Sequence, residues 1–311
     1  MQRYIIRRLF WLVVVLLAIS LITFALMHTI PGGPWDIDRP LSHLDPQLVD
    51  SLNSKFGLDR PWWEQYGSFL WNALQGDLGV SYTSGDTITG IILRSMPATL
   101  ILAAVAFAIA MVAGIALGMV AALRRNSWLD YLFSFISVAL VSTPGFVIGI
   151  ILMLIFGVSF NLLPVAGWGS PEDIILPALA LAAFPAALIA RITRASVLDA
   201  LQQDYVRTAK SKGLSYKTIL IRHVLRNAMI PILTISGPEL AFLVSGSVIV
   251  ETLFAIPGIG GHFVDAIFER DYGLIMGTTL FFAFAIVIAN LLVDILYVVV
   301  DPRIRLEEKA S

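Results

Sequence analysis

Six long apolar runs constrain this chain of 311 residues more than any other feature of its sequence. They lie at about residues 9–27, 98–123, 131–157, 174–190, 228–250 and 272–300. About 20 apolar residues in a helix cross a bilayer core, because each residue advances the helix axis by about 1.5 Å. Charged residues make up 14% of the chain, against about 25% in soluble domains. The runs therefore predict an all-α integral membrane protein with about six transmembrane helices.

Two of the runs are open to another interpretation. The first follows three arginines and resembles a signal peptide, but it is longer than the ~7–15 residues of a secretory apolar core and no small-residue cleavage site closes it. We expect a retained first span. The fourth run is the shortest and contains Pro177 and Pro185. A helix of about 17 residues can just cross a bilayer, and proline is tolerated where neighbouring helices satisfy the freed backbone groups.

The distribution of basic residues predicts the orientation, because positively charged loops remain in the cytoplasm. If both termini and the loops 123–130 and 191–229 are cytoplasmic, sixteen of the 21 Lys and Arg residues lie inside and five outside. Residues 31–97 then form an external segment. We find no internal repeat, low-complexity tract or flexible linker, so one membrane domain is expected over residues 1–311.

The external segment 31–97 is predicted to form short helices on the outer surface. Pro46 and Pro61 indicate helix starts, and Gly57 and Gly76 indicate the stops. Tryptophans in this segment favour an aromatic belt at the membrane interface, with a docking surface for an external partner as the alternative. These tryptophans are Trp35, Trp62, Trp63 and Trp71.

The sequence contains no motif that indicates an enzyme. A phosphate-binding loop is absent, and the glycine string 258–261 follows a span instead of opening a βαβ unit. An intramembrane serine protease at Ser245 or Ser247 would need a base at similar depth, but all four histidines fall in loops or at span ends. The histidines also lack partners at metal-ligand spacing, and the chain has no cysteine. We therefore predict no catalytic residue, no metal site and no cofactor bound by this chain.

The cytoplasmic loop 191–229 shows a helix–turn–helix pattern. Apolar residues recur near helical spacing from Val197 to Ala209, Gly213 can end a helix in the left-handed conformation, and Ser215 can cap the next helix. Since both arms continue into spans, a partner that moves the turn would tilt the spans. The alternative, a basic loop lying on anionic lipid, explains the charges but leaves the helical spacing unexplained.

The strings at residues 204–214 and 222–231 resemble the coupling loop of permease subunits in ABC importers of the dipeptide/oligopeptide/nickel family. Further strings are similar to the first-type permease of that family: 31–34, 57–61, 75–79, 251–260 and 301–305. The resemblance runs nearly end to end. Two features depart from the resemblance. In the loop, Arg207-Thr208-Ala209 stands where ABC importers in general have Glu-Ala-Ala, and the proline that follows the glycine comes later than in that general pattern, at Pro231. In addition, the segment 158–173 between the third and fourth spans is short.

The resemblance implies a type I importer permease in the plasma membrane of a bacterium or archaeon. It implies half of a translocation pathway for di- or oligopeptides, paired with a second homologous permease. Two cytosolic ATPase subunits would carry the ATP and Mg²⁺, and an external binding protein would deliver the cargo, which in related systems is also nickel complexes, glutathione or oligosaccharides. The residues implied in ATPase coupling are Asp204, Tyr205, Arg207, Thr208, Ala209, Lys212, Gly213 and Leu214.

Intramembrane polar residues provide the rival hypothesis. Glu239 and Asp294 lie within predicted spans, as acids do in channels and ion-coupled transporters. A structural or assembly subunit is the third reading. Within the permease hypothesis, Glu239 and Ser245 are candidates for the translocation pathway. Glu239 would either attract a cationic end of the cargo or serve as a buried structural acid, and Asp294 looks structural.

Overall fold

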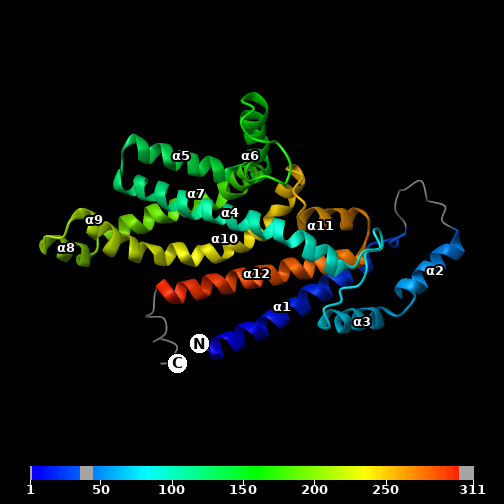
Figure 1. Cartoon of the computed structure of the whole chain (residues 1–311). Helices are drawn as coiled ribbons and strands as arrows, with labels where there is room; N and C mark the ends of the chain where they lie inside the picture. The colour runs from blue at the N-terminus through cyan, green and yellow to red at the C-terminus, as the bar shows by residue number, and fades with distance from the viewer. Residues whose placement is uncertain (1, 36–44, 301–311) are drawn as a thin grey trace. The chain divides into compact units, whose positions relative to one another are not determined.

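The computed structural model describes residues 2–35 and 45–300, and the side chains of residues 10–35, 45, 47–245 and 247–293. Within these residues the fold is helical, with no strand beyond one isolated bridge between Val80 and Thr87. The helical elements (Figure 1) are α1 Gln2–Thr29, α2 Pro46–Phe56, α3 Trp62–Leu74, α4 Ile88–Leu123, α5 Trp128–Ser142, α6 Gly145–Leu152, η1 Met153–Ser159, η2 Pro171–Ile174, α7 Ile175–Leu201, α8 Asp204–Ser211, α9 Tyr216–Thr218, η3 Ile219–Leu225, α10 Arg226–Leu253, α11 Ile259–Phe268 and α12 Tyr272–Val300.

The predicted fold class is confirmed by the length and composition of these helices. In the described part of the chain, five helices are long and apolar enough to cross a membrane, or six if one bent pair is counted as a span. The cytoplasmic placement of both termini stays a prediction.

The chain divides into two compact units, which are described separately. Unit 1 comprises residues 1–99 and 257–285, and unit 2 comprises residues 100–256 and 286–311. The prediction of one membrane domain over residues 1–311 stays a prediction.

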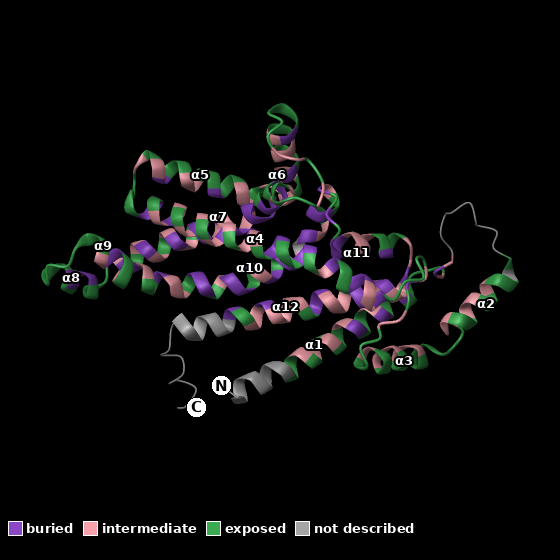
Figure 2. Cartoon of the chain, in the orientation of Figure 1, coloured by how far each residue is buried: buried purple, intermediate pink, exposed green. Residues whose placement is uncertain are grey.

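Unit 2 is built around α7, which contacts α5, α6 and α10 (Figure 1). Buried residues follow α7 along most of its length (Figure 2). Pro185 lies inside this helix. The fourth predicted span is therefore helical, and the helix continues past Pro185. Helix α4 packs closely on α7 because it presents glycine there: a Cβ on Gly118 would lie 2.4 Å from the Ala190 carbonyl oxygen. A Cβ on Gly114 would likewise lie 2.7 Å from the side chain of Ile189.

The third predicted span, 131–157, is not one continuous helix. Helix α5 and the segment Gly145–Ser159 form a bent pair with an angle of 110° between them. The break follows from Pro144, since the residue before a proline is pushed out of the helical region. Thr143 is accordingly extended, with φ −105° and ψ 126°.

The second predicted span begins earlier than expected. Helix α4 starts at Ile88 instead of Ala98 and holds Pro97 in its interior. The last ten residues of the predicted external segment therefore belong to this helix. The sequence pattern missed the extension because a proline, which has no backbone N–H to donate, usually marks a helix boundary.

Unit 1 confirms the short helices predicted within residues 31–97. The Asp45 side chain accepts a hydrogen bond from the Gln47 backbone N–H at the start of α2. Gly57 follows α2 with φ +69°, and Gly76 follows α3 with φ +82°. Both glycines thus end helices in the left-handed conformation, as predicted.

Trp35 belongs to an inward-facing aromatic cluster of unit 1. Its ring lies near the rings of Phe56 and Tyr82, and its indole N–H donates to Asn53 at 2.8 Å. Burial raises the pKa of the Tyr82 phenol, with further contributions from Asp271 and Tyr272. The predicted aromatic belt therefore does not extend to Trp35.

Candidate functional site

The predicted helix–turn–helix of residues 191–229 is present at one end of unit 2. Helix α7 continues to Leu201, and α8 begins at Asp204 after a bend in which Gln203 is extended. The first predicted helix is thus broken in two at residues 202–203. Since η3 leads directly into α10, the turn is joined on both sides to helices that are long enough to span a membrane.

The turn itself has the predicted chemistry. Gly213 takes φ +73°, and the backbone N–H of Leu214 donates to the Ala209 carbonyl across the end of α8. Glycine suits this position because a left-handed conformation is costly for residues with a Cβ. The Ser215 hydroxyl then accepts from the Thr218 backbone N–H, which caps α9.

An apolar cluster holds α8 against the rest of unit 2. Val206 and Ala209 are 1% and 4% exposed, and they pack with residues of α4, α7, η3 and α10. Burying a valine side chain is worth about 1.5–3 kcal/mol. Helix α8 is therefore packed firmly on the helices that share the cluster. Its buried members are Ala122, Val197, Ala200, Val206, Ala209, Ile219, Leu220, Val224 and Ala228.

The other predicted coupling residues lie on the exposed side of α8 and of the turn. Arg207 lies 3.6 Å from Asp204, but both side chains are almost fully exposed, so this ion pair contributes little to stability. Ala209 is the exception to the exposed set. The methyl group of Ala209 is buried in the apolar cluster of unit 2, so the packing of α8 explains why a small residue stands at this position. The exposed members of the predicted set are Asp204, Tyr205, Arg207, Thr208, Lys212, Gly213 and Leu214.

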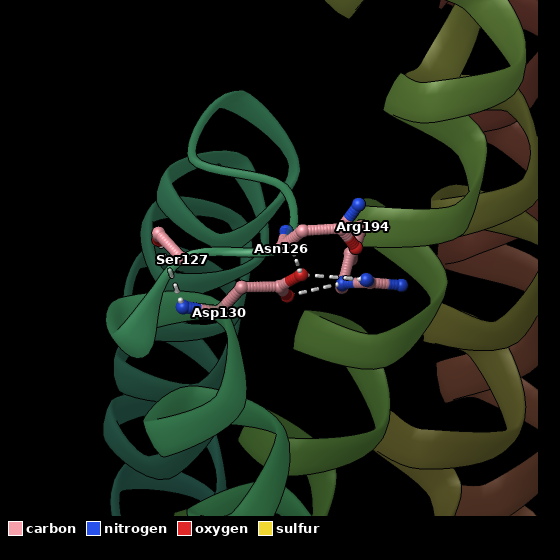
Figure 3. A network of polar contacts seen from close by, with 4 residues as sticks. All are labelled: Asn126, Ser127, Asp130 and Arg194. Atoms are coloured by element: carbon pink, nitrogen blue, oxygen red, sulfur yellow. Dashed lines mark hydrogen bonds and ion pairs between the residues drawn. The ribbon is translucent and has the colours of Figure 1, made fainter.

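An ion pair that the sequence analysis missed joins the start of α5 to α7 (Figure 3). Both carboxylate oxygens of Asp130 accept from the Arg194 guanidinium, at 2.6 and 2.8 Å. Asp130 also accepts from the Asn126 backbone N–H, and Ser127 caps α5 by accepting from the Asp130 N–H. The Asp130 side chain is only 3% exposed and that of Arg194 is 33% exposed. The serine and aspartate three residues apart signal a helix cap, but the partner lies 64 positions away.

The two candidate pathway residues lie on α10 and are not part of the turn. Glu239 is about 20 Å along the helix axis from Arg226, at 1.5 Å per residue. It is 8% exposed, and its Oε2 is buried with no hydrogen-bond partner among the described residues. Ser245, by contrast, donates to carbonyls of its own helix, those of Ala241 and Phe242. The side chain of Asp294 lies outside the described residues, as do residues 301–305.

Comparison with known proteins identifies what kind of protein carries this arrangement. Residues 114–306 match the family model described as "Binding-protein-dependent transport system inner membrane component". The chain belongs to this family. Residues 1–103 match the model for the N-terminal part of binding-protein-dependent transport system membrane components.

Individual relatives cover the whole chain. It is 40% identical to the dipeptide transport system permease protein DppB of Bacillus subtilis over 310 residues, which are 99% of this chain and 100% of the relative. It is 39% identical to DppB of Lactococcus lactis, over 98% of this chain and 100% of the relative. It is 38% identical to the glutathione transport system permease protein GsiC of Escherichia coli K12, over 98% of this chain and 99% of the relative.

A solved structure supports the fold alone. A chain of the inward-facing MetNI methionine ABC transporter superposes with a TM-score of 0.53 at 16% sequence identity, covering 68% of this chain and 96% of that chain. The predicted identity, a permease component of a binding-protein-dependent importer, is thereby confirmed at the level of family and fold. The chain is a multi-pass membrane protein.

Proposed function

We propose that this chain forms half of the translocation pathway of an ATP-driven importer of di- or oligopeptides in a bacterial or archaeal plasma membrane. It pairs with a second, homologous permease and receives cargo from an external binding protein. Two cytosolic ATPase subunits bind ATP and Mg²⁺ and hydrolyse the ATP, so no covalent chemistry falls to this chain. The full-length identity of about 40% to dipeptide permeases supports peptides as the cargo class.

The observation that carries the proposal is the construction of α8. The helix buries Val206 and Ala209 in a cluster that includes residues of α4, α7 and α10, and it leaves its other side exposed. An ATPase subunit that grips the exposed side can therefore move several spanning helices together. This is the geometry that coupling requires, because rigid-body rocking of permease halves alternates access to a site between them.

Glu239 is proposed as a contact of the translocation pathway. An ionised carboxylate at the centre of a membrane helix costs about 2.5–3.5 kcal/mol on insertion scales, so it is expected to face a protein interior or a wet cavity. Its Oε2 is buried without a hydrogen-bond partner among the described residues, so the ammonium of a peptide would pair with it only after the surrounding helices move apart. Ser245 has a weaker claim, since its hydroxyl is already hydrogen-bonded within α10.

Cross-linking from single cysteines tests the coupling site, because the chain has no native cysteine. In the assembled transporter, Tyr205→Cys and Leu214→Cys should cross-link to an ATPase subunit through a short bifunctional reagent. Ala209→Cys is the matched control on the same helix, and its buried side chain should not react. Absence of cross-links from positions 205 and 214, in a complex that retains its ATPase subunits, would contradict the proposed coupling surface.

A further inference from the structure

Helix α3 of unit 1 has two chemically different faces. Tyr66 and Phe69 pack against Phe24 and Met27 of α1, in a cluster that also includes residues of α12. Gln65, Ser68 and Asn72 line a cavity of about 300 Å³ together with residues of α1, α2 and α12. This side of α3 therefore packs on α1 and borders the cavity, where Ser68 and Asn72 remain exposed.

The opposite side of α3 is largely apolar and exposed, and there the Trp63 ring lies edge-on to the ring of Trp62. Trp63, Trp71 and Leu74 are 60%, 67% and 83% exposed. Their spacing of eight and three residues places them on one side of a helix, roughly opposite Gln65 and Asn72. Glu64, the only charged residue of α3, is exposed and lies seven residues before Trp71, so it borders this face, here called the tryptophan face, near the start of the helix.

Two hydrogen bonds fix the level at which α3 lies along α1. The Tyr66 hydroxyl bonds to the Ser20 hydroxyl at 2.9 Å, and the His28 ring bonds to the Gln65 amide oxygen at 3.3 Å. Ser20 is nine residues before Thr29, or about 13 Å along the helix at 1.5 Å per residue. Since the candidate span is Phe10–Thr29, Tyr66 reaches a residue near the middle of a membrane-crossing helix.

The face of α1 at the same level is built for lipid. Ile22 and Leu26 of α1, and Ile30 just after its end, are 59%, 59% and 56% exposed, and this stretch has no charged side chain. A helix packed beside it at the level of Ser20 to His28 enters the same apolar environment. Tryptophan suits the boundary of that environment, because its ring is apolar while its indole N–H needs a polar partner.

We propose that α3 is embedded in the leaflet next to the C-terminal end of α1, with Trp63, Trp71 and Leu74 in contact with lipid. The partner of the tryptophan face is the bilayer interface, and the helix lies in it as an amphipathic anchor. An exposed tryptophan pair also suits a protein interface, but the depth of Tyr66 beside Ser20 favours lipid. The inference does not depend on which cargo is transported.

Spin labelling measures this depth directly. Nitroxides are attached to Trp71→Cys and, separately, Leu74→Cys in the assembled transporter, reconstituted in phosphatidylcholine/phosphatidylglycerol vesicles. Collision rates with oxygen, which concentrates in lipid, and with a water-soluble nickel chelate are compared. Ser51→Cys on the exposed side of α2 is the water-facing control, and Trp63→Cys is a further variant on the tryptophan face.

The expected result is a higher ratio of oxygen to nickel collisions at positions 63, 71 and 74 than at position 51, unchanged by saturating binding protein. Equal ratios at all four positions would overturn the proposal. A fall in both collision rates at positions 71 and 74 when binding protein is added would assign the face to that protein and would also overturn it.

Discussion

Single residues of the proposed coupling turn differ in what the sequence could predict about them. Gly213 and Ser215 carry local backbone signals, and the structure shows the left-handed glycine and the serine cap at those positions. Ala209 was predicted in the coupling set because it matches a family string, and only the fold shows that its methyl group is buried. Local chemistry is readable in the sequence, whereas the direction in which a side chain points depends on neighbours far along the chain.

Gly213→Val is predicted to uncouple ATP hydrolysis from cargo. A Cβ at Gly213 would meet no atom within 4 Å, so the expected cost is conformational. A left-handed conformation costs a residue with a Cβ about 1–2 kcal/mol, and valine is a poor choice for it. The cargo-stimulated ATPase activity of the assembled transporter should be largely lost, with normal abundance of the chain.

Two controls accompany the Gly213 variant. Gly213→Asn should retain most of the activity, because asparagine tolerates the left-handed region. Gly76→Val imposes the same kind of strain in unit 1, also in open surroundings, and should leave coupling intact. Normal stimulated activity of Gly213→Val would remove the turn from the coupling mechanism.

Glu239→Gln tests whether the buried acid contacts cargo. Under the pathway hypothesis the variant keeps its assembly and basal ATPase activity, but KM for positively charged peptides rises severalfold, since an attraction to the ammonium is lost. Uptake kinetics of cationic, neutral and anionic peptides provide the measurement. Equal kinetics for all three classes would leave Glu239 with a structural role.

Helices were largely predictable, but their bends and ends were not. The apolar runs locate every candidate span, and the predicted sixth span coincides with α12. The break at Pro144 lies inside a continuous apolar run, where hydrophobicity alone gives no signal of a 110° bend. The sequence pattern gives no signal of the break at residues 202–203 either, because the segments on its two sides contribute apolar residues to one cluster.

The Asp130–Arg194 pair is predicted to hold the start of α5 on α7. Asp130→Ala should destabilise the protein by about 1.5–3 kcal/mol, the usual contribution of hydrogen bonds to charged groups. Thermal unfolding of the purified chain in detergent measures the loss. Asp86→Ala removes the exposed pair with Arg94, whose side chains are both more than half exposed, and should cost only about 0–1 kcal/mol. Equal stability losses in the two variants would argue against a special role for Asp130.

At the scale of the whole molecule, orientation rests on the distribution of basic residues. Cysteines introduced at Ser51, Ser170 and Ser211 are matched, since all three positions are exposed. Those at positions 51 and 170 should react with an impermeant thiol reagent added to intact cells, and the one at position 211 should react only after the membrane is opened. Labelling of position 211 in intact cells would reverse the proposed orientation.

The family and general fold could be predicted from the sequence because short strings and long apolar runs are both local features. The division into two compact units could not, since each unit combines distant segments, such as residues 1–99 with 257–285. Two polar contacts were unpredictable for the same reason: the hydrogen bond between Ser20 and Tyr66, and the ion pair between Asp130 and Arg194. Each joins helices whose neighbourhood is set only by the folded chain.

The central claim, that this chain is a passive permease driven by separate ATPases, is tested most directly by uptake into proteoliposomes. The transporter is reconstituted with its partner permease and ATPase subunits, ATP is enclosed in the lumen, and a radiolabelled dipeptide is added outside with its binding protein. The account predicts uptake that requires both ATP hydrolysis and binding protein. Uptake of equal rate with a non-hydrolysable ATP analogue, or driven by an ion gradient through this chain alone, would contradict it.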